Sequence, residues 1–135
     1  MKKIYSKIDN KLLHIVGSIS DIIGERADIA PEEEYLQLAV LKMNKGKTFK
    51  PHKHIKFEKV TDIAQESWFV HRGSVKCIFY DLDDTISEEI IINEGEFSMT
   101  FRGGHNYKIL EDDTQVLEYK TGPYLGVESD KTFIN

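Results

Sequence analysis

The chain has 135 residues, of which 40% are hydrophobic and 30% are charged. This length fits one domain that can bury a core without disulfide staples, and the composition is ordinary for a soluble protein. The net charge of −5, from 18 basic and 23 acidic residues, argues against a nucleic-acid partner, because phosphate binding needs clustered Lys and Arg.

Cysteine usage and the N-terminal sequence indicate a compartment. Cys77 is the only cysteine, so an intrachain disulfide is excluded and nothing indicates an oxidising environment. The basic start, MKKIYSKIDN, is followed by a polar stretch instead of the apolar core of a signal peptide. No apolar run approaches the roughly 20 residues that a membrane-spanning helix needs. We expect a cytoplasmic protein with no membrane partner.

The N-terminal third gives weak structural signals. Residues 11–23 fit a short strand or a helix interrupted by Gly17. Residues 24–34 are polar and contain Pro31, which indicates a connection.

From residue 35 onward, apolar and β-branched segments alternate with turn signals, a pattern typical of strands. The exception is the charged segment 55–65, which we interpret as a loop with one helical turn near Thr61 as an alternative. Short strands at this spacing predict an all-β domain, either a sandwich or a barrel. The predicted strands are 35–43, 48–55, 66–73, 74–81, 86–93, 97–101, 103–110 and 114–121.

Two histidines stand one residue apart in GKTFKPHKH, residues 46–54. If 48–55 is a strand, His52 and His54 project to the same face and can chelate one ion. The alternative is a pair of solvated histidines in a lysine-rich loop. Glu66 begins an aromatic strand, where an inward-facing acid is disfavoured unless it is paired or bound to metal. His105 follows a Gly-Gly pair, where the backbone can turn sharply.

These residues resemble the first motif of the cupin superfamily, G-x5-H-x-H-x(3,4)-E-x6-G. Gly46, His52, His54, Glu66 and Gly73 match its order and most of its spacing. The departure is the gap of eleven residues between His54 and Glu66, which a surface loop can absorb.

The segment GEFSMTFRGGHNYKI, from Gly95, resembles the second cupin motif, G-x5-P-x-G-x2-H-x3-N, in degraded form. Phe101 replaces the proline and Ile109 replaces the asparagine, while His105 is kept one residue early. Glu58, four residues after His54, is an alternative acid that lacks the following E-x6-G pattern.

The resemblance implies an all-β cupin fold, a double-stranded β-helix (jelly-roll) barrel. The single domain would span 1–135, with a barrel core at about 35–121 and a short N-terminal extension. It also implies a divalent metal ion (Fe, Mn, Ni or Zn) held by His52, His54, Glu66 and His105. Cupins commonly form homodimers, which makes residues 1–30 candidates for exchange between subunits.

The runs AQESWFVHRGSVKCIFYD and LEYKTGPYLGVESDKTFI are similar to small cupin metalloproteins encoded in bacterial surface-polysaccharide gene clusters. This similarity implies an isomerase or epimerase that acts on a sugar or sugar-nucleotide, with Tyr107 or Glu66 moving the proton. We expect a small-molecule substrate that is anionic or sugar-like. The lysines around the first motif are expected to form a solvated rim, with attraction of an anionic ligand as the alternative. Alternatives are an iron-dependent dioxygenase of a small organic acid or thiol, a metal-free ketoisomerase using His and Tyr, and a non-catalytic binding or sensing cupin.

The other histidines, the cysteine and Arg102 are not expected to bind the metal ion. His71 has the opposite strand parity to Glu66 and is expected to point away from the site. His14 lies outside every motif, and Cys77 shares parity with Val75 and Phe79, so both are expected to be structural. Arg102 is expected to be solvated, with contact to an anionic substrate as the alternative.

Overall fold

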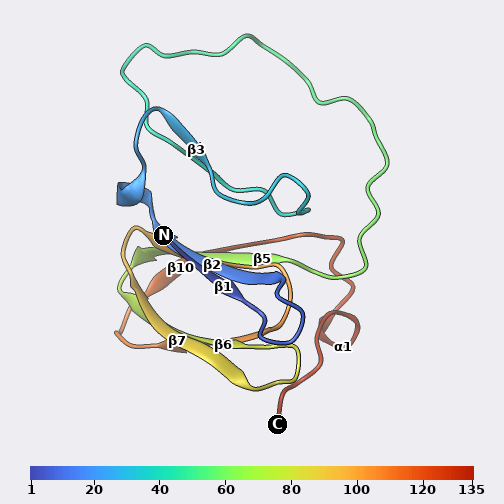
Figure 1. The fold of residues 1–135 in the computed structure, drawn as a ribbon. Helices are drawn as coiled ribbons and strands as arrows, with labels where there is room; N and C mark the ends of the chain where they lie inside the picture. Colours follow the sequence, from blue (N-terminus) through green and yellow to red (C-terminus); the bar gives the residue numbers. More distant parts are fainter.

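The computed structural model describes residues 1–135 as an all-β chain with short helical turns (Figure 1). A 3-10 helix spans Ile19–Asp21, and α1 spans Val127–Asp130 near the C-terminus. The ten strands are β1 (Lys2–Tyr5), β2 (Leu12–Ser18), β3 (Arg26–Asp28), β4 (Ala39–Leu41), β5 (Glu66–Arg72), β6 (Ser74–Tyr80), β7 (Ile86–Asn93), β8 (Glu96–Thr100), β9 (Gly104–Ile109) and β10 (Gln115–Lys120).

The strands form three antiparallel sheets that do not close into a barrel. The largest has the order β1-β2-β8-β5-β10, the second has the order β7-β6-β9, and β3 and β4 form a separate hairpin. Figure 1 shows the five-stranded and three-stranded sheets stacked as two layers. The expected all-β class is therefore confirmed, and the expected closed barrel is replaced by an open sandwich.

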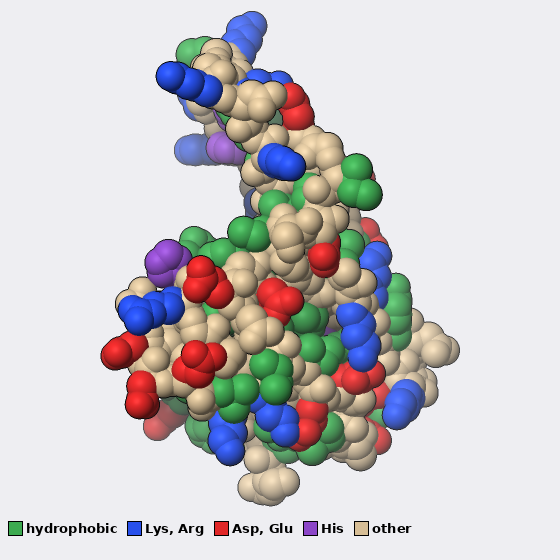
Figure 2. All heavy atoms as spheres, turned by 90° about the vertical axis from the view of Figure 1, so that its left-hand side faces the viewer, with side chains coloured by type: hydrophobic (Ala, Val, Ile, Leu, Met, Phe, Trp, Pro, Cys, Tyr) green, Lys and Arg blue, Asp and Glu red, His purple; other side chains and the backbone are tan.

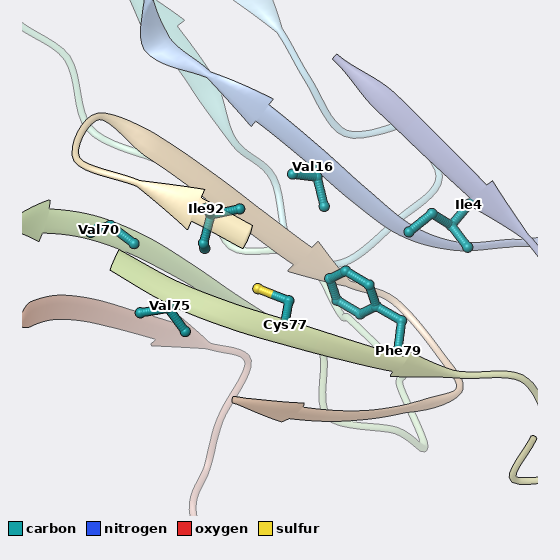
Figure 3. Close-up of a cluster of buried hydrophobic side chains, with 7 residues drawn as sticks. All are labelled: Ile4, Val16, Val70, Val75, Cys77, Phe79 and Ile92. Carbon is teal, nitrogen blue, oxygen red and sulfur yellow. The ribbon is translucent and has the colours of Figure 1, made fainter. Parts of the chain in front are cut away.

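The main core lies between these two layers (Figure 3). Strand alternation produces it, because every second residue of β6 points inward. Val75, Cys77 and Phe79 are fully buried, as their shared parity predicted. They meet inward-facing side chains of the large sheet and of β7, namely Ile4, Val16, Val70 and Ile92.

A second core covers the opposite face of the five-stranded sheet. Ile15, Phe97 and Met99 pack there against Ile29 and Ala30, which lie in the connection between β3 and β4. Both faces of the large sheet are thus covered, which explains why β2 is buried along five consecutive positions. The N-terminal residues are an integral part of this sheet and not an appended extension.

Most strands downstream of residue 65 match their predicted ranges. The segment predicted at 86–93 coincides with β7, and the turns expected after residues 43, 81, 93 and 110 are present. The segment predicted at 35–43 is a strand only at Ala39–Leu41. The prediction of a strand at 48–55 is wrong for this structure, because these residues have no hydrogen-bonded neighbour and no regular structure.

Residues 42–64 form one long irregular connection, which we call the arm. Figure 1 shows the arm leaving the β3–β4 hairpin, arching away from the sheets and returning to the start of β5. Every residue of the arm is exposed. The loop expected at 55–65 lies within it and ends at buried Gln65, but the alternative helical turn near Thr61 does not form. No helix of the structure has the length and apolar character needed to cross a membrane.

Candidate functional site

The candidate site lies where β5 and β9 face each other at one end of the sandwich. Glu66 and Trp68 share parity with buried Val70, so they point from the large sheet into the space between the layers. His105 and Tyr107 pair with Phe79 and Cys77 in the register of β6 and β9, so they share an inward face as well. Two strands from different sheets therefore bring these four side chains together.

Glu66 is the centre of the polar contacts. Its Oε1 atom lies 3.2 Å from Nε2 of His105 and accepts a hydrogen bond from Nε1 of Trp68 at 2.9 Å. The same indole N–H lies 3.1 Å from Oε2 of Glu118 on β10. Glu66 is only 6% exposed, so its charge is compensated mainly by these neighbours. Nδ1 of His105 is buried without any hydrogen-bond partner.

Aromatic rings form the inner wall of the site. Trp68 stacks on Tyr107 with ring centroids 3.9 Å apart and planes within 14°, and the His105 ring centroid lies 5.2 Å from that of Tyr107. The Tyr107 hydroxyl lies 3.1 Å from Oγ of Ser98. Burial raises the pKa of Tyr107 far above its ordinary value, so this phenol stays protonated at neutral pH.

The environment of Glu66 keeps it ionised. Burial alone would raise the pKa of Glu66, but the hydrogen bond and charge of His105, with smaller contributions from Lys131 and Trp68, bring it below its ordinary value. Glu66 is therefore a carboxylate at neutral pH.

These side chains line a cleft of about 700 Å³. Its walls come from the ends of β5, β8, β9 and β10, the 81–84 turn, the C-terminal segment 130–134 and the last two residues of the arm, Ile63 and Ala64. The charged lining residues are mostly acidic: Glu66, Asp81, Asp84, Glu118 and Asp130 against Arg102 and Lys131. Arg102 is already engaged, because its guanidinium donates to the Leu12 carbonyl at 2.6 Å and to Glu34 at 2.8 Å.

The four predicted metal ligands do not form one group in this structure. Glu66 and His105 converge, whereas His52 and His54 lie in the exposed arm with ring centroids 5.7 Å apart. Glu58, the alternative acid, is also on the arm. No group of three or more His, Cys, Asp or Glu side chains that could hold a metal ion is present. As arranged here, the residues supply half of the predicted ligand set.

The remaining reactive residues lie outside the Glu66–His105 pair. His14 is fully buried, with Nδ1 3.0 Å from Oγ1 of Thr100, and His71 is exposed, as expected. Cys77 is a core residue, and burial raises the pKa of its thiol to about 12. Arg102 differs from the expectation of a solvated side chain, because it is paired with Glu34 and bound to the Leu12 carbonyl.

The site also contains two residues that belong to none of the sequence motifs. Glu118 reaches Trp68 because the two residues are paired in the β5–β10 register. Lys131 is brought to the cleft by the C-terminal segment. No sequence motif marks either residue, and only the strand register and the path of the C-terminal segment identify them.

Known proteins provide no further constraint on this site. A scan against protein-family models, a search of curated proteins and a search of solved structures each return no match to this chain.

Proposed function

We propose that this chain is an isomerase or epimerase of a small sugar-like carbonyl compound, acting through proton transfer by Glu66 and His105. The observation that carries the proposal is the 3.2 Å contact between their side chains at a 700 Å³ cleft with an aromatic wall. A carboxylate paired with an imidazole in a cleft is a recurrent acid–base arrangement.

The roles follow from the contacts of each group. Glu66 is ionised, its Oε1 is held by Trp68 and His105, and Oε2 accepts no hydrogen bond from the protein. Glu66 would remove a proton from the carbon beside the substrate carbonyl, and His105 would supply a proton to the carbonyl oxygen. For isomerisation, a proton returns to the former carbonyl carbon while the adjacent hydroxyl loses its proton to His105 and becomes the new carbonyl. For epimerisation, a proton returns to the opposite face of the same carbon while His105 takes back the proton that it gave to the carbonyl oxygen. Tyr107, with its raised pKa, would position Trp68 and orient substrate without changing protonation state.

The cleft lining supports an uncharged sugar ring as the reacting part of the substrate. Five acidic residues against Arg102 and Lys131 disfavour an anionic group inside the cleft. An aromatic wall with a few convergent polar groups suits a compact polyol. The acidic, aromatic lining therefore favours a sugar-like substrate over an anionic one.

A cupin-type jelly roll is the fold that we propose for this site. The stacked antiparallel sheets are compatible with it, and the motif residues Glu66, Gly103 and His105 line the cleft. A divalent ion held by His52, His54, Glu66 and His105 does not fit the single chain, because the first two lie on the exposed arm. The proposed proton transfer needs no such ion.

The experiment is solvent-deuterium exchange. A panel of aldoses, ketoses and keto-sugar nucleotides would be incubated with the protein in D₂O, with mass spectrometry reporting deuterium at the carbon beside the carbonyl. We expect incorporation with at least one substrate and a loss of about 100-fold or more in Glu66→Gln and His105→Asn, because both remove a proton-transfer group.

The matched control is His71→Asn, which changes an exposed histidine of the same strand that carries Glu66. This variant should keep the wild-type exchange rate. Exchange that persists unchanged in His105→Asn, or a sugar that binds the wild type in the cleft without any exchange, would contradict the proposed reaction.

A further inference from the structure

The arm has the properties of a docking segment rather than of a solvated loop. All of its residues, 42–64, are exposed, yet it carries large apolar side chains: Phe49 is 58% exposed, Ile55 84%, Phe57 70% and Val60 72%. Clustered exposed apolar side chains on a soluble protein mark an interaction surface. If 49–57 is extended, Phe49, Ile55 and Phe57 share one face, and His52 and His54 share the other.

The charge of the arm is opposite to that of the rest of the chain. Seven lysines against Glu58 and Asp62 give the arm a net charge of +5, and because the whole chain carries −5, the remaining 112 residues carry −10. Figure 2 shows lysines or arginines projecting from the protruding part of the molecule, while acidic side chains are numerous on the body below it. Complementary surfaces of this kind steer association and fix its register.

The body offers a receiving surface of matching character. The cleft lining is predominantly acidic, and it is bordered by β9 and β10, each of which is an edge strand with a single hydrogen-bonded neighbour. Edge strands present unpaired backbone groups to an added strand. At the outer edge of β9, the Tyr107 amide is satisfied only by the side chain of its own neighbour, Asn106, at 2.8 Å.

The arm is long enough to reach a second molecule. From its anchor in β4 or β5 to its middle there are about eleven residues, which span roughly 35 Å when extended. A body of this size has a radius of gyration of about 13 Å. The N-terminal strands, by contrast, already pair within their own chain as β1-β2-β8, so they are poorer candidates for exchange than the arm.

We propose that the arm of one copy docks along the β9 edge and acidic cleft of a second copy, in a reciprocal two-fold dimer. Phe49, Ile55 and Phe57 would be buried against the partner, and the opposite face would carry His52 and His54 to the partner's cleft, beside Glu66 and His105. The site would then be built from two chains. This dimer does not depend on the reaction proposed above.

Crosslinking tests the exchange directly. Cys77 is buried, so cysteines introduced by Lys53→Cys in the arm and Asn106→Cys on β9 are the reactive ones. We expect a short bis-maleimide to join the two single-cysteine variants into a covalent heterodimer when they are mixed. In the double variant we expect crosslinked dimers rather than an internally crosslinked monomer.

The oligomeric state of the full chain gives the second measurement. We expect a dimer by light scattering, with a dissociation constant at least about tenfold weaker at 0.5 M than at 0.1 M salt, because the charges being matched lie at the surface. Replacement of 44–62 by a Gly-Ser linker of equal length should give a folded monomer.

A monomeric wild type at micromolar concentration, a dimer that survives the linker replacement, or a crosslink only within one chain would each overturn the proposal. A fully exposed arm that binds heparin while the chain stays monomeric would also overturn it and indicate a polyanion partner.

Discussion

The contact between Glu66 and His105 joins the two layers of the sandwich at the cleft. Glu66 belongs to β5 in the five-stranded sheet, and His105 belongs to β9 in the three-stranded sheet. Because Glu66 is nearly buried, loss of His105 would leave a carboxylate compensated mainly by the Trp68 indole. The pair therefore has a structural role in addition to the proposed chemistry, so activity measurements on its variants need a parallel measurement of stability.

His14 lies behind this pair and gives a pH dependence that can be measured. Burial lowers its pKa to about 4, with the nearby His105 lowering it further and the Tyr80 carbonyl and Asp81 opposing this. The unfolded chain takes up a proton below about pH 6.5, and the folded chain only below about pH 4, so stability falls as the pH drops through this window. We expect the free energy of unfolding to decrease by about 3 kcal/mol between pH 7 and pH 4 from this residue.

Urea denaturation at several pH values checks the His14 prediction. His14→Asn should flatten the dependence between pH 6.5 and pH 4, whereas exposed His71→Asn should leave it intact. The lowered pKa of Glu66 acts in a different range, since its contribution is lost only below pH 4.5. An unchanged pH dependence in His14→Asn would show that this histidine is not held neutral by the fold.

At the level of single residues, the alternation of side chains along each strand predicted which side chains are buried and which are exposed. Alternation placed Val75, Cys77 and Phe79 inside and His71 outside, and both predictions are confirmed. Tyr107 and His105 also share parity on β9, and both line the cleft. Contacts between strands that are distant in sequence, such as Trp68 with Glu118, depend on register and were not predictable from periodicity.

At the level of elements, the entry into β9 depends on one glycine. Gly103 has φ of +78°, and a Cβ atom added there would lie 2.6 Å from the Tyr80 carbonyl oxygen and 3.4 Å from Nε2 of His14. A left-handed backbone costs an L-residue about 1–2 kcal/mol, and the clash with the backbone adds to this cost. This geometry sets the direction in which β9 leaves the turn, and thereby the position of His105.

We expect Gly103→Ala to lower the free energy of unfolding by about 2 kcal/mol or more, because strain and overlap both act. Gly46→Ala is the matched control: its φ is +89°, but a Cβ atom there meets nothing within 4 Å. The control should cost less than Gly103→Ala, at most about 1–2 kcal/mol, since only backbone strain is involved. Thermal or urea denaturation measures the free energy of unfolding of both variants. Equal losses would show that the Tyr80 carbonyl moves away from the added Cβ atom without an energetic penalty.

The arm shows why an element can be misassigned from its pattern. Residues 48–55 have the alternation of a strand, but a strand exists only when a neighbour supplies hydrogen bonds, and no neighbour is present within the single chain. By contrast, each of β5 to β10 has at least one hydrogen-bonded neighbour within the single chain, so the strand pattern there corresponds to a real strand. The same pattern is compatible with a strand that forms only against a second chain.

At the level of the whole molecule, the separation of charge is the dominant feature. The net charge of −5 did not indicate a protein partner, because it is the sum of +5 on the arm and −10 on the rest of the chain. The cupin resemblance predicted four ligands in one site, and the single chain assembles two of them, Glu66 and His105. Exchange of the arm would unite the complete set without any change in the two sheets.

This arrangement makes a prediction for metal content that distinguishes assembly between chains from assembly within one chain. We expect the wild type to bind one divalent ion per chain, measured by elemental analysis after loading with Fe, Mn, Ni or Zn under matched conditions. His52→Ala/His54→Ala and His105→Ala should each lose it, because each lacks part of every site. When the two variants are mixed and allowed to exchange, each heterodimer contains one complete site, so about a quarter of all clefts should regain the ion. Sites assembled within one chain would regain none, and retention of the ion by His105→Ala alone would show that the cleft is not the metal site.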